Sequence, residues 1–126
     1  MEIRKLLVAN RGEIAARVFR TCRRLGIEPV AVYAPDDEGA FHTRQAEEAV
    51  SVLSYLYSEE IVRAAKRAGA DAIHPGYGFL AENGDFAEAV DAAGLVFVGP
   101  GPEAIRSAGD KLEATVLLSR AASLWS

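Results

Sequence analysis

The chain is poor in the residues that cross-link small domains or bind metals. Its 126 residues include one cysteine and two histidines. Cys22 has no second cysteine with which to form an internal disulfide, and the two histidines form no Cys/His cluster of the kind that holds zinc. We therefore predict no metal site, and the single cysteine favours a reducing, cytoplasmic location.

Long apolar runs are also missing, and positive charge does not dominate. The N-terminus lacks the apolar core of a signal peptide, and no run is long enough to cross a membrane. Fourteen basic and eighteen acidic residues give a net charge of −4. This balance argues against non-specific nucleic-acid binding by the whole surface, and it leaves a local basic patch open. We expect neither a membrane nor a nucleic acid as a partner.

What is present is typical of one α/β domain. Half of the residues are hydrophobic, enough for a core at this length. Four short apolar runs without in/out alternation indicate strands buried on both faces, as in a parallel sheet. These runs are Lys5–Ala9, Pro29–Ala34, Ala70–His74 and Leu95–Val98, with Val50–Leu53 as a candidate fifth strand.

Helical periodicity lies between these runs. Apolar residues recur on one face over Glu13–Leu25, Ser58–Ala68 and Asn83–Ala93, with Ser58 as the expected N-cap of the second helix. Two more helices are expected at 102–109 and 110–120. The order predicts a doubly wound, mainly parallel sheet of four to five strands, with helices on both faces.

Ligands of such sheets bind beyond the carboxyl ends of the strands, so the loops there are candidate sites. The first loop contains Arg11 and a single glycine, and therefore fails the dinucleotide-binding fingerprint. Either Arg11 meets an anion at the helix N-terminus, or Asn10 and Glu13 simply cap the helix; capping is the simpler interpretation.

The same helix carries Arg17, Arg20 and Arg24 on one face. Such a stripe is either a solvated face or a contact surface for a partner, and the sequence favours neither interpretation.

The richest loop follows His74 and reads Pro75-Gly76-Tyr77-Gly78. The two glycines allow a ligand or another domain to approach the backbone closely, and Tyr77 should project between them. His74, without a nucleophile motif beside it, is expected to be a hydrogen-bonded structural residue. Glu82 lies near a helix N-terminus, where a carboxylate is favoured for structural reasons alone.

Lys111 follows Gly109 and Asp110 in the first turn of an expected helix. The helix dipole disfavours a cation there, which suggests a phosphate contact, although the P-loop motif is absent.

Together these motifs resemble the N-terminal domain of biotin carboxylases, from about Ile3 to Leu118. The matching stretches are LVANRGEIA at 7–15, HPGYGFLAEN at 74–83, FVGP at 97–100 and GDK at 109–111. The family includes the biotin carboxylase of acetyl-CoA carboxylase and the corresponding parts of pyruvate, propionyl-CoA and methylcrotonyl-CoA carboxylases.

The resemblance implies a Rossmann-like, pre-ATP-grasp domain of an ATP-dependent ligase. Such enzymes use Mg²⁺-ATP and bicarbonate to form carboxyphosphate and then carboxylate biotin on a carrier protein or domain, which serves a carboxyltransferase. By resemblance, Lys111 contacts the nucleotide, and Tyr77, Gly78 and Glu82 lie on the biotin side of the active site. The arginine stripe resembles a subunit contact, which implies a homodimer.

The chain departs from the family pattern in three places. The segment before residue 58 is shorter than usual, Ala81 stands where a serine is common, and the tail at 121–126 is atypical. We expect residues 1–120 to form the domain and the ATP-grasp and C-terminal domains to be absent. The isolated chain should then be inactive, with no catalytic residue of its own, and should bind no cofactor tightly. The alternatives are a non-catalytic binding or dimerisation module, and a domain of a carbamoyl-phosphate synthetase relative.

Overall fold

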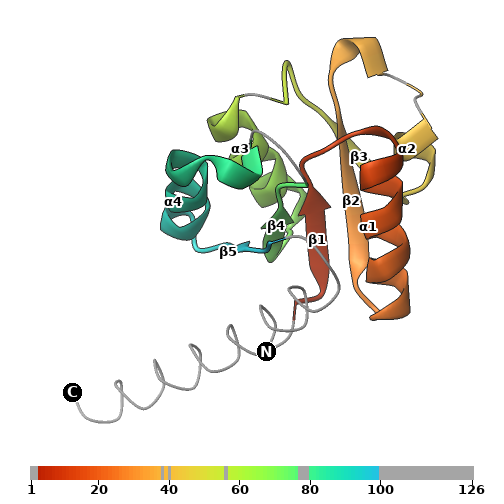
Figure 1. Ribbon diagram of the computed structural model, residues 1–126, viewed down its shortest axis with the longest axis horizontal. Helices are drawn as coiled ribbons and strands as arrows, with labels where there is room; N and C mark the ends of the chain where they lie inside the picture. Colours follow the sequence, from red (N-terminus) through yellow and green to blue (C-terminus); the bar gives the residue numbers. More distant parts are fainter. Residues whose placement is uncertain (1–2, 38, 40, 56, 77–79, 100–126) are drawn as a thin grey trace.

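Five short parallel strands form one sheet, with the order β3-β2-β1-β4-β5 (Figure 1). The computed structural model describes residues 3–37, 39, 41–55, 57–76 and 80–99. The strands are β1 (Lys5–Val8), β2 (Glu28–Tyr33), β3 (Glu48–Ser51), β4 (Ala72–His74) and β5 (Val96–Phe97). The parallel sheet and its candidate fifth strand are confirmed, although β3 begins two residues before the expected position.

Four helices connect the strands: α1 (Gly12–Arg24), α2 (Phe41–Arg44), α3 (Ser58–Ala68) and α4 (Gly84–Ala92). The three predicted helices within the described ranges are confirmed, whereas α2 was not anticipated. The cap predicted for α3 is wrong. Tyr57 occupies the N-cap position, and its carbonyl accepts the first backbone bonds of the helix. The helices expected at 102–109 and 110–120 and the tail at 121–126 lie outside the described residues.

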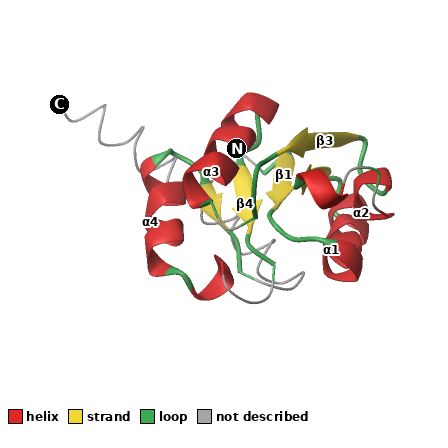
Figure 2. Ribbon diagram, turned by 90° about the horizontal axis from the view of Figure 1, so that it is seen from above, coloured by secondary structure: helices red, strands yellow, loops and turns green. Residues whose placement is uncertain are grey.

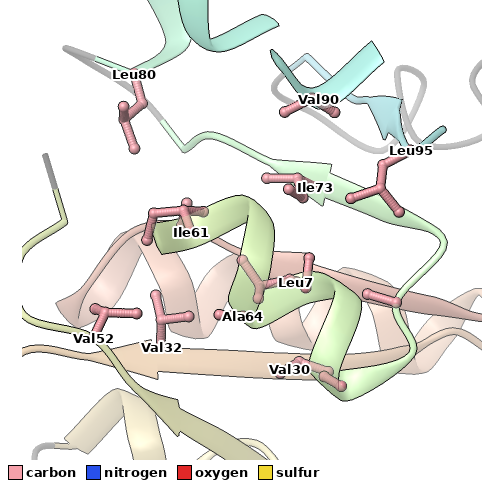
Figure 3. Close-up of a cluster of buried hydrophobic side chains, with 14 of the residues drawn as sticks. Leu7, Val30, Val32, Val52, Ile61, Ala64, Ile73, Leu80, Val90 and Leu95 are labelled. Carbon is pink, nitrogen blue, oxygen red and sulfur yellow. The ribbon is translucent and has the colours of Figure 1, made fainter. Parts of the chain in front are cut away.

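Helices cover both faces of the sheet, which makes three layers (Figure 2). On one face, α1 buries Val18, Phe19 and Cys22 against the strands. On the other face, α3 lies across Leu7, Val30 and Val32 (Figure 3), and α4 packs beside it. In the described part, no helix is long and apolar enough to span a bilayer.

The adjacent strands β1 and β4 send the chain to opposite faces. β1 leads into α1, whereas its neighbour β4 leads into α4 on the far side of the sheet. Such a switch point opens a crevice at the carboxyl ends of the two strands, which is where doubly wound folds bind ligands. The fold therefore directs attention to the loops after β1 and β4.

Candidate functional site

The loops after β1 and β4 meet in a close backbone contact that depends on a glycine. Gly76 has a φ of +73°, and a Cβ added there would lie 2.0 Å from Asn10 Nδ2. An L side chain fits neither this backbone conformation nor this space. We call Asn10, His74 and Gly76 the β1–β4 crossing. It fixes the backbone at the residue that immediately precedes Tyr77.

His74 stabilises the crossing through two hydrogen bonds. The Ala9 N–H donates to the His74 carbonyl at 2.8 Å, which extends the pairing of β1 with β4. The Gly76 N–H donates to His74 Nδ1 at 2.9 Å, which assigns the ring proton to Nε2. Burial lowers the pKa of His74 to about 4, so the ring is neutral at neutral pH. The structural role predicted for His74 is confirmed.

Arg11 lies on the other side of β1, beside a buried carboxylate. Its Nη2 donates to Asp37 Oδ1 at 2.7 Å, and the Arg11 side chain is 65% exposed whereas that of Asp37 is 8% exposed. The capping interpretation of this loop is wrong. The Asn10 side chain accepts from the Arg11 N–H, and Glu13 pairs with Arg20, so neither caps α1.

Two further side chains join this cluster, which we call the Asp37 network (Arg11, Asp37, His42 and Tyr55). The Tyr55 hydroxyl donates to Asp37 Oδ2 at 2.7 Å. His42, almost fully buried, has its Nε2 2.8 Å from the Val32 carbonyl, which leaves the ring as the donor. Burial raises the pKa of the Tyr55 hydroxyl, and its hydrogen bond to Asp37 raises it further. The network thus ties the loops after β1, β2 and β3 together.

The sequence pattern does not predict the Asp37 network. Its members come from three separate segments, and residues 36–57 show no clear periodicity. One signal for the network is available in the sequence. Asp37 follows β2 by four residues and Arg11 follows β1 by three, so parallel pairing of the two strands places both residues near the same sheet edge.

The remaining predicted site residues divide into two groups. Glu82 is exposed at the end of the short 3-10 turn Leu80–Glu82, and the next residue, Asn83, caps α4 by accepting from the Phe86 N–H at 3.1 Å. Tyr77, Gly78 and Lys111 lie outside the described residues, so their predicted roles remain predictions.

The arginine stripe belongs to helix α1 and not to the crossing. Arg17, Arg20 and Arg24 are all exposed on α1. Arg20 pairs with Glu13 at 2.9 Å. This geometry suits a solvated face and a contact surface equally well, so the two interpretations stay open.

Nucleophile and metal chemistry find little support in the described residues. Burial raises the pKa of the Cys22 thiol to about 12, which keeps it protonated and inert. No group of three or more His, Cys, Asp or Glu side chains that could hold a metal ion occurs in the described ranges.

The sheet order and the crossing define a doubly wound α/β domain whose candidate ligand site lies at the β1–β4 switch point. Residues 2–105 match the family model described as "Biotin carboxylase, N-terminal domain". Since this match covers most of the chain, the chain belongs to the family of biotin carboxylase N-terminal domains.

Relatives support this assignment. Over 122 residues the chain is 51% identical to the mitochondrial pyruvate carboxylase of Rattus norvegicus, covering 91% of this chain and 10% of that protein. It is 55% identical over 115 residues to biotin carboxylase 1 of Bacillus subtilis (strain 168), covering 86% of this chain and 26% of that protein. The chain thus spans about a quarter or less of the length of these curated relatives.

A solved structure agrees with the fold. The biotin carboxylase domain dimer of Hydrogenobacter thermophilus 2-oxoglutarate carboxylase, in complex with MgADP, ADP and bicarbonate, matches with a TM-score of 0.75. The two are 47% identical, and the match covers 84% of this chain and 24% of that one.

Proposed function

We propose that the chain serves as the N-terminal domain of an ATP-dependent biotin carboxylase, which carboxylates biotin with bicarbonate. The observation that carries this proposal is the family match over residues 2–105, which includes both loops of the β1–β4 crossing. The match favours this function over a carbamoyl-phosphate synthetase relative. In the proposal, residues 1–120 form the functional unit and the tail at 121–126 takes no part.

The crossing gives this domain a concrete task at the active site. Asn10 and His74 hold Gly76 in one backbone conformation, directly before Tyr77 and Gly78. We assign Tyr77, Gly78 and Glu82 to the biotin side of the site and Lys111 to the nucleotide. A backbone that is already fixed before the substrate arrives lowers the entropic cost of binding.

Arg11 is a candidate anion contact. Asp37 orients its guanidinium, and the Arg11 side chain remains 65% exposed at the N-terminal end of α1. A bicarbonate or phosphate oxygen approaching this edge would find a charged donor already in place.

The described residues hold no group of three or more His, Cys, Asp or Glu side chains that could bind a metal ion. We therefore assign none of them to the metal and derive no step through it. ATP, Mg²⁺ and biotin belong to the proposed whole enzyme, with a biotin carrier and a carboxyltransferase as partners in the cytoplasm. The arginine stripe is the proposed contact in a homodimer.

The proposal is tested with a chimera. Residues 3–118 replace the corresponding segment of Bacillus subtilis biotin carboxylase 1, and ADP release is measured with free biotin, bicarbonate and Mg²⁺. We expect biotin-dependent turnover within about tenfold of the intact enzyme, which is a small loss on the scale of catalysis. Turnover no higher than that of the enzyme lacking the segment, from a chimera that is soluble and folded, would contradict the proposal.

The chain alone provides the complementary test. We expect no ADP release above a protein-free blank, since phosphoryl transfer requires a metal ion and we assign none of the described residues to it. Turnover by the chain alone would show that its catalytic groups are among residues we assign to scaffolding.

A further inference from the structure

A groove lies between helix α3 and the segment that follows β3. Its volume is about 630 Å³, and Val52 and Leu53 line it on one side. Val52 is buried beside Val32 and Ile61 at the margin of the core (Figure 3). The groove therefore has an apolar base that is continuous with the hydrophobic core.

The opposite wall is basic. Arg63, Lys66 and Arg67 line the groove from α3, against the single carboxylate of Glu60. The Glu60 carboxylate accepts a hydrogen bond from the Leu53 N–H, and the three cations form no ion pair with other described residues. This local excess of positive charge contrasts with the net charge of −4 for the chain.

Two large hydrophobic side chains are exposed at this place. Leu53 is 71% exposed and lines the groove, and Tyr57 is 57% exposed. Tyr57 lines an adjoining hollow of about 400 Å³, which shares Glu60 and Arg63 with the groove. Within the described ranges, Leu53 and Tyr57 are the large hydrophobic residues that are exposed to solvent. Exposed apolar residues beside arginine and tyrosine are typical of protein interaction surfaces.

We propose that this surface, the Leu53 groove, docks an acidic segment of a partner protein that carries an apolar side chain between its carboxylates. The apolar side chain lies against Val52 and Leu53, and the carboxylates meet the cations of α3. Charge complementarity selects an acidic partner. The apolar base and the acidic chain as a whole favour a polypeptide over a nucleic acid or a lipid surface.

The test needs neither ATP nor a second domain, so its outcome is independent of the proposed function. Short synthetic peptides of glutamates with one leucine at varied positions are titrated into the ¹⁵N-labelled chain. We expect shifts of the Leu53 and Arg63 amides, with a dissociation constant of about 100 μM or tighter, and small changes at Phe86 in α4. A matched peptide set has glutamine in place of every glutamate and should bind at least tenfold more weakly.

Substitutions locate the binding site. Leu53→Ser should weaken binding about tenfold and Arg63→Gln about fivefold, because each removes one of the two recognition elements. Both side chains are accessible to solvent, so the variants should fold, which melting curves verify. Arg23→Gln, the same change at an exposed position of α1, should leave binding unchanged.

Several outcomes would overturn the proposal. One is that no peptide binds at about 1 mM. Another is that neither groove substitution changes the affinity, and a third is that the glutamine peptides bind as tightly as the glutamate peptides. Self-association of the chain that Leu53→Ser abolishes would identify a second copy as the occupant instead. Tighter binding to single-stranded DNA or to anionic vesicles would likewise replace the protein partner.

Discussion

The β1–β4 crossing and the Asp37 network flank the same strand, β1, and are built on opposite principles. The crossing depends on the lack of a side chain at Gly76, because the Asn10 side chain occupies the space where a Cβ would lie. The network works through side chains that are present, with one buried carboxylate between Arg11 and Tyr55. Glycine contacts fix a backbone path, whereas charged hydrogen bonds fix the relative positions of loops. The difference makes the two regions separable by mutation.

The largest effect is expected from Gly76→Ala. The variant must place a Cβ where Asn10 lies and adopt a φ of +73°, so we expect the free energy of unfolding to fall by about 3 kcal/mol. Gly69→Ala is the matched control, because Gly69 has the same φ with nothing within 4 Å. It should cost about 1 kcal/mol in urea unfolding. Equal losses in the two variants would show that the Asn10 contact is not tight.

The next effect depends on pH. The pKa of His74 is lowered to about 4 in the folded state from an ordinary value of 6.5, so the unfolded state binds a proton first as pH falls. The stability that neutral His74 contributes is complete above about pH 6.5 and decreases as pH falls toward 4. Between pH 7.5 and 5 the loss should be about 2 kcal/mol.

His74→Asn isolates this contribution. The amide oxygen of asparagine can accept from the Gly76 N–H in place of Nδ1, but it does not titrate. The variant should therefore lose about 2 kcal/mol less than the natural chain over the same pH interval. If both chains lose stability in parallel, the His74 ring is not held neutral by burial.

The network responds to Asp37→Ala. The change removes the closest acceptor of the half-buried Tyr55 hydroxyl, which leaves the Val32 carbonyl at 3.5 Å, and it breaks the ion pair with Arg11, so we expect a loss of about 2 kcal/mol. Asp36→Ala, at the exposed neighbouring position, should change stability by less than about 0.5 kcal/mol. Similar losses for the two alanines in thermal unfolding would indicate that Asp37 is not central to the network.

The smallest effect is expected from Tyr55→Phe, which removes one hydroxyl and leaves the Arg11–Asp37 pair intact. A single hydrogen bond to a charged group suggests a loss of about 1.5 kcal/mol. Tyr33→Phe is the control, because its hydroxyl makes no hydrogen bond in the described part. Calorimetric unfolding of the two variants should differ by that amount, and no difference would place the Tyr55 hydroxyl outside the network.

The two regions also differ in how well the sequence predicts them. The segment after His74 has two glycines and a proline directly after a strand, and this local pattern marked it as a candidate site. The contact of Gly76 with Asn10 joins loops far apart in the chain, and only the sheet order brings them together.

The Asp37 network was not predicted because each member has an ordinary local context. Aspartate after a strand and tyrosine before a helix are common, and their burial depends on where the segments between β2 and α3 settle. The sheet and the three main helices were predictable, since strand burial and helical periodicity are local properties. Capping was mispredicted at Ser58 and around Asn10, where neighbouring backbone and side-chain groups compete for the same donors.

The chimera with the Bacillus subtilis enzyme provides the most direct test of a functional edge at the β1–β4 crossing. In it, kcat/KM for biotin is measured for Asn10→Ala and for Tyr55→Phe, with folding verified by thermal unfolding. We expect Asn10→Ala to lower kcat/KM about tenfold or more, because it releases the backbone before Tyr77, and Tyr55→Phe to change it less than about threefold. Equal losses in the two variants, or a larger loss for Tyr55→Phe, would contradict a functional edge at the β1–β4 crossing.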